Sequence, residues 1–418
     1  MCVSLSSARA ALSRHSAFCG LARLLPLLLL AVAAAHGQEG LPESVQIHGF
    51  ASQAYIKTDE NNFFGESEDG SLEFYELGIN GSWAPRPDLQ FSLQVVSRDA
   101  GAADNGALRV DYGFLDYSFV ASATDLWGVR LGRIINPFGF YNDTRDVAFT
   151  RPSILLPQSI YFDSARALAL SSDGVQFYGE RRTDAGDFFL QIGYARPRAD
   201  DIEFKLAAFR ANLPGKLDGA LPSMFARILY ESIGGAWRFG LSAIKANVDY
   251  ESRAPFPADL PDGRFSFTPL YFSGQYNSDR WSITGEYALR TTELRDFAPF
   301  IDDKFTGESY YLQGSYRFTP KWEGFLRYDV LYWDKDDRGG TKWEAAGRGP
   351  YHSAFARDWT VGLRWDVTDN FMLRAEYHNV DGTGWLPISD NPDLINPATW
   401  DNVERRWNLF ALLASLRF

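Results

Sequence analysis

Charged side chains recur at alternate positions along many segments of the chain, opposite an apolar face. In residues 281–290, Glu286 and Arg290 lie on one face of an extended segment, and Trp281 and Tyr287 lie on the other. Arginine stays charged and is poorly tolerated in lipid, so rows of such residues would line a water-filled lumen and select ions there. Alternatively, these charges only pair with one another across neighbouring strands. The candidate lining residues are Arg98, Arg130, Arg182, Arg227, Glu286, Arg290, Arg327, Asp329, Arg364, Arg374 and Glu376.

Motifs for catalysis or metal binding are missing from residues 38–418. This part of the chain has no phosphate-binding glycine loop, zinc-protease histidine motif, nucleophile elbow or cysteine pair. We interpret His378 as a solvated wall residue. The segment 334–339 is similar to a calcium loop, but Arg338 stands where an oxygen ligand belongs. We therefore expect no enzymatic activity, no catalytic or metal site and no cofactor.

The connections between the alternating segments are short and long in strict turn. Short ones lie at 84–88, 121–125, 182–186, 231–235, 277–280, 319–321 and 367–370, and long ones at 57–70, 98–106, 134–174, 197–223, 251–263, 292–307, 334–357 and 381–404. These connections imply about 16 strands of roughly ten residues, a length that crosses a bilayer at a tilt. We predict an all-β fold: a transmembrane antiparallel β-barrel with short periplasmic turns and long extracellular loops.

Tryptophan placement supports the same geometry. Trp83, Trp127, Trp237, Trp281, Trp322 and Trp365 lie within two residues of a short turn, and Trp333 and Trp359 lie at the opposite strand ends. Rings gathered at two depths are typical of the aromatic girdles at the two faces of a membrane.

The first 37 residues have the pattern of a secretory signal peptide. Arg9, Arg14 and Arg23 precede an apolar stretch at 24–35, and we expect cleavage after Ala35 or Gly37. The whole chain has a net charge of −12 and the removed segment holds three Arg and no acid, so the mature chain, residues 38–418, carries −15. This acidic balance argues against nucleic acid as a partner.

The end of the chain, residues 410–418, alternates apolar side chains and closes on an aromatic residue. Together with the signal peptide, the loop alternation and segments such as 132–140 and 307–314, this ending makes the chain resemble proteobacterial outer-membrane porins whose solute is not established. The resemblance covers residues 41–418. The resemblance implies that Phe418 is an assembly signal read by the barrel assembly machinery. It also implies the outer membrane of a Gram-negative bacterium, contact with lipid and lipopolysaccharide, and a homotrimer.

The third long connection, residues 134–174, is the candidate constriction. It carries many large apolar side chains, which a loop folded into the barrel could pack against the wall. The resemblance implies this inward fold, because the third long loop of general porins narrows the pore. An ordinary surface loop or a subunit contact is the alternative. The charged residues that would then face the wall are Asp143, Arg145, Asp146, Arg151, Asp163 and Arg166.

The function predicted from these features is passive diffusion of small hydrophilic solutes or ions through a porin. Two alternatives stay open. One is a substrate-specific anion channel, for example for phosphate. The other is a barrel that acts as an enzyme or as a surface-binding protein.

Overall fold

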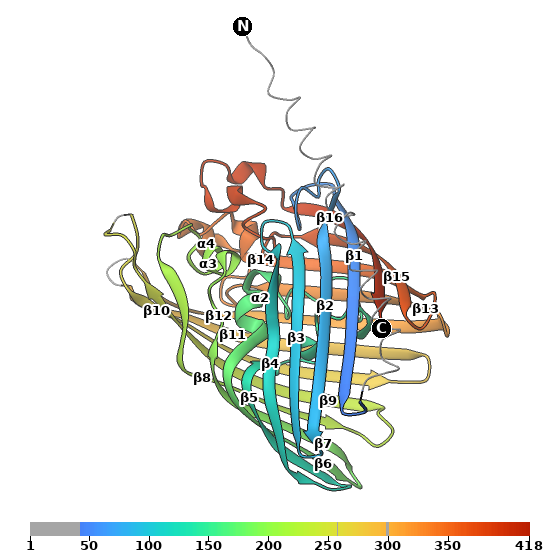
Figure 1. The fold of residues 1–418 in the computed structure, drawn as a ribbon. Coiled ribbons are helices and arrows are strands. Elements are labelled where there is room, and N and C mark those ends of the chain that lie inside the picture. Colours follow the sequence, from blue (N-terminus) through green and yellow to red (C-terminus); the bar gives the residue numbers. More distant parts are fainter. Residues whose placement is uncertain (1–41, 257, 298–300) are drawn as a thin grey trace.

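Antiparallel strands in the described part of the chain form one closed sheet, and the barrel prediction is confirmed (Figure 1). The computed structural model describes residues 42–256, 258–297 and 301–418, so the predicted signal peptide at 1–37 lies outside the described residues. The strands are β1 (Val45–Thr58), β2 (Ser71–Arg86), β3 (Leu89–Ala100), β4 (Asn105–Ala121), β5 (Asp125–Ile135), β6 (Ser171–Thr183), β7 (Gly186–Pro197), β8 (Lys216–Glu231), β9 (Trp237–Glu251), β10 (Gly263–Asn277), β11 (Trp281–Phe297), β12 (Ile301–Thr319), β13 (Trp322–Tyr332), β14 (Phe355–Asp366), β15 (Phe371–Asp381) and β16 (Arg406–Arg417).

The helices of the described residues are short and all lie in long connections. They are α2 (Arg166–Leu170), α3 (Ile202–Phe209) and α4 (Thr341–Ala345), with 3-10 turns η2 (Asn142–Thr144), η3 (Ala148–Thr150), η4 (Asp163–Ala165), η5 (Tyr351–Ala354), η6 (Pro392–Ile395) and η7 (Trp400–Asn402). The Asp201 side chain caps α3 by accepting a hydrogen bond from the Phe204 N–H at 2.9 Å. Over the described ranges, no helix has the length and apolar character needed to cross a membrane.

The two faces of each strand differ as period-two alternation requires. On β11, the outward Trp281 and Ile283 are 41% and 45% exposed, whereas the inward Glu286 and Arg290 are 3% and 2% exposed. Large apolar side chains are therefore exposed around the outside of the barrel, where a bilayer would cover them. The charged residues predicted from alternation face the interior instead.

Two long connections are much shorter than the sequence suggested. We expected loops at 98–106 and 292–307, but β3 continues to Ala100 before β4 starts at Asn105, and β11 runs to Phe297 before β12 starts at Ile301. The polar residues of these segments suggested loops. In the structure they extend the paired ladder, as at Glu293 opposite Lys304. A strand can be polar on both faces once it projects beyond the bilayer into water.

The aromatic girdle at the short-turn end is present on the outer surface. Trp83, Trp237 and Trp281 there are 50%, 47% and 41% exposed. At the opposite end, Trp359 is 52% exposed, as a girdle residue should be. The expectation for Trp333 is wrong, because this residue follows β13 and is half-buried inside the barrel, with its indole N–H donating to the Gly384 carbonyl at 2.8 Å.

The last strand closes the barrel. β16 pairs with β1 from Arg417 opposite Phe50 to Leu409 opposite Thr58. Beyond it, Phe418 and Gly49 exchange backbone hydrogen bonds of 3.0 and 3.2 Å. A Cβ placed on Gly49 would lie 2.3 Å from the Phe418 ring, so the glycine makes room for the terminal aromatic.

Deleting Phe418 is expected to reduce the yield of assembled barrel severalfold, because both backbone hydrogen bonds to Gly49 and the ring that covers it are lost. Heat-modifiable migration on a gel measures closure. As a control, Phe318→Ala removes an outward ring that is 57% exposed and should leave assembly unchanged. Normal yield of the truncated chain would contradict an assembly role for the terminal residue.

Candidate functional site

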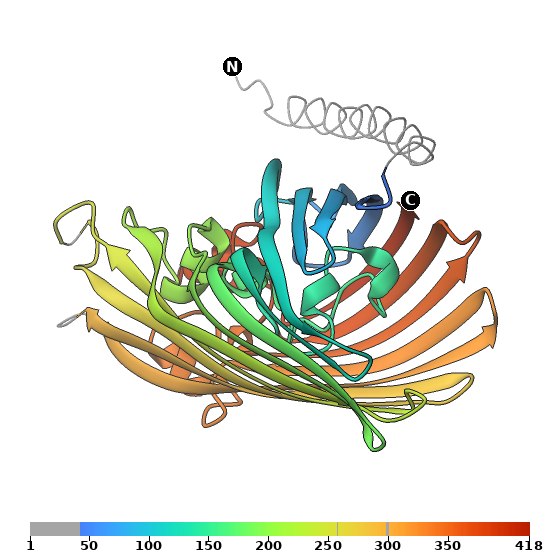
Figure 2. The same cartoon turned by 60° about the horizontal axis from the view of Figure 1, so that its bottom comes forward.

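Residues 136–170, between β5 and β6, lie inside the ring of strands. We call this segment the inner loop. Figure 2 shows its ribbon within the curve of the barrel. It contains η2, η3, η4 and α2, and it forms hydrogen bonds or ion pairs with side chains of β2, β3, β8, β11, β13, β14 and β15. The inner loop therefore contacts the wall on opposite sides of the lumen.

Acidic wall side chains accept hydrogen bonds from backbone N–H groups of the inner loop. Glu376 on β15 accepts from the N–H of Ile154 and, at 3.3 Å, from that of Leu155. Glu286 on β11 accepts from the Phe140 N–H at 3.1 Å and from the Tyr161 hydroxyl at 2.6 Å. Each buried carboxylate thus receives donors that replace lost water, as burial of a charge requires.

Asp329 on β13 makes a similar contact, accepting from the Ser159 N–H at 3.3 Å. The Tyr311 hydroxyl of β12 also donates to Glu286, at 2.9 Å. The sequence analysis did not identify Tyr311 or Tyr161 as site residues. No sequence signal connects either tyrosine to a carboxylate more than twenty residues away in the chain.

Wall arginines donate to backbone carbonyls of the same loop. Arg327 reaches the Leu155 carbonyl at 3.1 Å and the Ser153 hydroxyl at 2.9 Å. Arg374 reaches the Arg151 carbonyl at 2.6 Å. Further donations run from Arg227 to Gly139 at 3.1 Å and from Arg364 to Phe149 at 3.5 Å. The carboxylates of the wall thus bind the N–H groups of the inner loop, and the arginines of the wall bind its carbonyl groups.

A cluster of buried ions joins the inner loop to β2 and β3. Glu76 on β2 is fully buried and lies 2.7 Å from Arg151 and 3.5 Å from Arg98. Arg98 also binds Asp163 of the loop at 2.9 Å. Burial and the neighbouring guanidinium groups lower the pKa of Arg166 in this cluster. The cluster therefore depends on its acidic members, because removing one would leave like charges facing each other.

Apolar residues of the inner loop pack against the wall. Phe138 stacks on Tyr271 of β10 with ring centroids 4.9 Å apart. Ile160 is fully buried in the same cluster. On the other side, Ile154 and Leu155 join a cluster that includes Leu409 and Leu413 of β16. This packing gives a physical reason for the apolar character of residues 134–174.

The predicted charged residues of the loop fall into two groups. Arg145, Asp146, Arg151, Asp163 and Arg166 are at most 10% exposed and take part in the buried ion cluster. Asp143 is 38% exposed and forms an ion pair with Arg227 on β8. Of the three carboxylates in this set, Asp143 and Asp163 pair with wall arginines, and Asp146 pairs with Arg166 of its own loop.

The predicted lining residues mostly face the inner loop, but they are not solvated as expected. Eight are 1–5% exposed: Arg98, Arg227, Glu286, Arg290, Arg327, Asp329, Arg374 and Glu376. Arg130 and Arg364 retain side-chain exposures of 29% and 25%, with partners Asp116 and Asp366 at 2.8 Å. Arg182 sits at the short-turn end of β6, 61% exposed and paired with Glu180. The inner loop, which sequence alone does not place, replaces water around the first eight.

His378 differs from the solvated wall residue that we expected. It is 1% exposed, and its ring nitrogens lie 2.8 Å from Asp358 and 3.5 Å from Glu376. Since Glu376 also holds the inner loop, this histidine is closed off from solvent beneath it. His378 therefore belongs to the buried network of charged residues that holds the inner loop. Among the described residues, no group of three or more His, Cys, Asp or Glu could hold a metal ion.

Comparisons with known proteins identify the fold. No protein-family model and no curated protein matches the sequence. The outer membrane channel DcaP of Acinetobacter baumannii matches with a TM-score of 0.56 and 14% identity, over 90% of this chain and 97% of that one. In-vitro folded OmpT, an outer membrane protein of Vibrio cholerae, matches with a TM-score of 0.54 and 11% identity, over 90% and 97%. An anion-selective porin from Comamonas acidovorans matches with a TM-score of 0.51 and 13% identity, over 90% and 99%. The chain has the porin fold.

Replacing a buried wall arginine is expected to destabilise the barrel. Arg327→Met leaves the Leu155 carbonyl and Ser153 hydroxyl without their donor, at a cost of about 3 kcal/mol. Arg182→Met is the matched control at an exposed site and should change stability by less than about 0.5 kcal/mol. Urea titration of the refolded protein in detergent gives both free energies of unfolding. Equal values for the two variants would mean that Arg327 is solvated.

Proposed function

We propose that this protein is a porin of the outer membrane of a Gram-negative bacterium, a passive diffusion channel for small hydrophilic solutes or ions. The observation that carries the proposal is the inner loop, which lies inside a closed barrel and binds its charged inner face. A barrel of sixteen strands encloses more space than its own side chains fill. Water occupies what the loop leaves open, and solutes follow the water.

Charge selectivity in this proposal rests on the wall residues that keep some exposure. Arg130 and Arg364 are candidates, because neither is enclosed by the inner loop to the extent that Arg327 is. A passing ion in a narrow lumen stays within a Debye length, about 10 Å at 0.1 M salt, of every fixed charge on the wall. Partly exposed arginines therefore act on the ion even when a carboxylate pairs with them.

The proposal includes no enzymatic activity. His378 is the histidine most deeply embedded in the charge network of the wall, and its ring nitrogens face Asp358 and Glu376. A general base must come within hydrogen-bond reach of a substrate. The buried position of His378 beneath the inner loop supports a structural role in place of a catalytic one.

We also propose a homotrimer. The support is a solved structure of Vibrio cholerae OmpT described as a trimer form, which matches this chain with a TM-score of 0.53 and 12% identity. Barrels of this fold expose apolar outer strands that a neighbouring copy can cover in place of lipid.

The purified protein is expected to conduct when added to a planar lipid bilayer. Replacing residues 141–162 by a short glycine linker should raise the single-channel conductance severalfold, because the part of the inner loop that crosses the lumen is removed. Heat-modifiable migration confirms that each preparation is folded. A folded wild-type barrel without conductance would exclude a pore, and unchanged conductance after the deletion would mean that the loop does not limit flow.

Neutralising the partly exposed arginines is expected to shift selectivity toward cations. The double variant R130Q/R364Q removes two partly exposed positive charges, and the only hydrogen bond to the inner loop that it removes is the 3.5 Å contact of Arg364 with the Phe149 carbonyl, so the barrel should remain stable. The reversal potential in a salt gradient measures the shift. R182Q/R317Q removes two exposed arginines near the short turns and is the matched control, with a smaller expected change. Equal reversal potentials in both double variants would contradict this assignment.

A further inference from the structure

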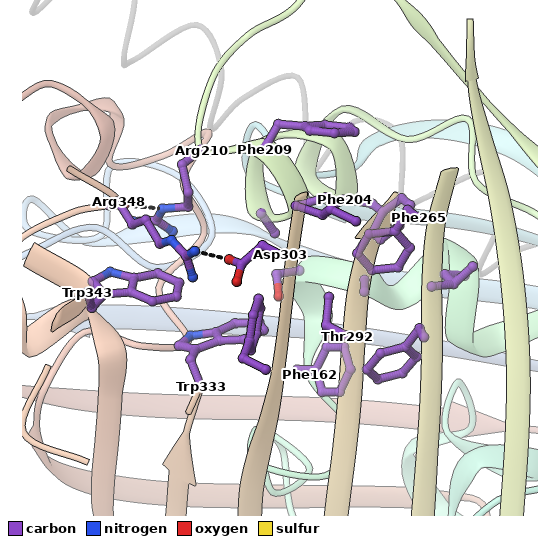
Figure 3. Close-up of a pocket in the computed structure, with 18 of the residues that line it drawn as sticks. Phe162, Phe204, Phe209, Arg210, Phe265, Thr292, Asp303, Trp333, Trp343 and Arg348 are labelled. Carbon is purple, nitrogen blue, oxygen red and sulfur yellow. Dashed lines mark hydrogen bonds and ion pairs between the residues drawn. The ribbon is translucent and has the colours of Figure 1, made fainter. Parts of the chain in front are cut away.

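A cavity of about 480 Å³ opens at the long-loop end of the barrel, beside the inner loop (Figure 3). Its walls come from the inner loop, the end of α3, strands β10 to β12 and the connection that contains α4. The lining is mainly apolar, and its aromatic rings include Phe162, Phe204, Phe209, Phe265, Trp333 and Trp343. This volume lies in the range of sites that hold small organic molecules, and the aromatic lining favours an apolar ring.

Charged side chains line one side of the cavity. Arg210 and Arg348 lie there with a single carboxylate, Asp303, so the lining has a net charge of +1. Arg348 forms an ion pair with Asp303, and the two side chains are still 32% and 27% exposed. Arg210 donates to the Arg348 carbonyl at 2.6 Å. Both guanidinium groups also lie over the Trp343 ring, at 5.6 and 5.4 Å.

The environment of the two arginines disfavours unpaired positive charge. Burial lowers the pKa of Arg210 to about 10, although the nearby Glu203 acts in the opposite direction. The Glu203 carboxylate lies outside the lining and accepts hydrogen bonds from the N–H groups of Ile388 and Ser389 at 2.7 and 2.9 Å. Burial lowers the pKa of Arg348 as well. An incoming anion would relieve this deficit.

A third guanidinium lies just beyond the aromatic wall. Arg290 on β11 is 2% exposed, with its Cζ 5.3 Å from the Phe162 ring and 5.5 Å from the Trp333 ring, both of which line the cavity. Its Nε and one Nη have no hydrogen-bond partner, and the other Nη makes only a 3.5 Å contact with the Tyr332 carbonyl. A third positive charge therefore lies against the aromatic lining of the cavity.

The few uncharged polar groups argue against a sugar as the occupant. Ser164 and Thr292 are the uncharged hydroxyl side chains in the lining. The indole N–H groups of Trp333 and Trp343 already donate to the Gly384 carbonyl and the Ser353 hydroxyl, at 2.8 and 3.0 Å. A sugar would bury hydroxyl groups without partners here, whereas a planar ring with one anionic group would not.

We propose that this cavity binds aromatic carboxylates, with the ring against the Phe and Trp side chains and the carboxylate facing Arg210 and Arg348. A guanidinium fork matches a carboxylate in shape and charge. This inference rests on the proposed function, because the cavity serves as an entrance site for one class of solute only in a channel.

Binding of benzoate to the folded barrel in detergent, measured by isothermal titration calorimetry, tests this proposal without requiring conduction. Arg348→Gln lowers the net charge of the lining to zero and should weaken benzoate binding about tenfold, or 1.4 kcal/mol. Asp303→Asn raises that charge and should strengthen binding. Benzamide, which has the ring without the charge, and acetate, which has the charge without the ring, should both bind weakly to the wild type.

Arg317→Gln is the matched control, since Arg317 also pairs with an acid, Glu323 at 3.2 Å, but at the short-turn end. It should leave benzoate binding unchanged. The proposal is overturned if the folded wild type does not bind benzoate or if Arg348→Gln binds it as tightly. Weaker binding in both Arg348→Gln and Asp303→Asn would also overturn it, because the ion pair would then only hold the loop. A protein that does not conduct would contradict the proposed function but would not affect this test, because calorimetry measures benzoate binding and not conductance.

Discussion

The rest of this structure depends on one constraint: the hydrocarbon core of a bilayer offers no hydrogen-bond partners to the backbone. In hydrocarbon every N–H and C=O must be paired within the protein, and an antiparallel sheet achieves this only by closing. Here closure requires β16 to meet β1, with Phe418 and Gly49 completing the seam. Because the sheet has sixteen strands, closure also creates an interior that the wall side chains alone do not fill. The inner loop fills part of that interior.

The inner loop stays inside because the wall and the loop satisfy each other. Carboxylates such as Glu376 accept from its N–H groups, and arginines such as Arg327 donate to its carbonyls. Neither partner would be stable alone: the loop backbone would be buried without hydrogen bonds, and the wall charges would lack partners once water was displaced. The apolar contacts of Phe138 and Ile154 add the burial that a loop in water could not provide. The position of the loop inside the barrel and the charges of the wall therefore depend on each other.

The fold could be predicted from sequence much further than the site. Period-two alternation and the alternation of loop lengths depend only on local composition, and they predicted the strand count and every short turn. The same local criterion failed where a polar ladder projects into water, as at residues 292–307, and at Trp333, which turns inward after the end of β13. Partners such as Tyr161 with Glu286 join residues far apart in sequence, so their pairing follows from the inner loop's path across the lumen. Alternation predicted which wall residues face inward but not whether water or protein meets them there.

The burial of most wall charges changes how the selectivity of such a barrel should be understood. A guanidinium that is buried beneath the inner loop, as Arg374 is at 4% exposure, has little capacity left for a passing solute. The net charge of the chain is therefore a poor guide to selectivity, since it counts paired and exposed groups alike. In the proposed channel a solute meets a smaller set: the arginines at the cavity beside the inner loop, then wall residues such as Arg130 and Arg364 that keep partial exposure. In this proposal the buried charges hold the loop and the exposed charges act on the solute. Selectivity can therefore change through the exposed residues while the buried ones keep the loop anchored.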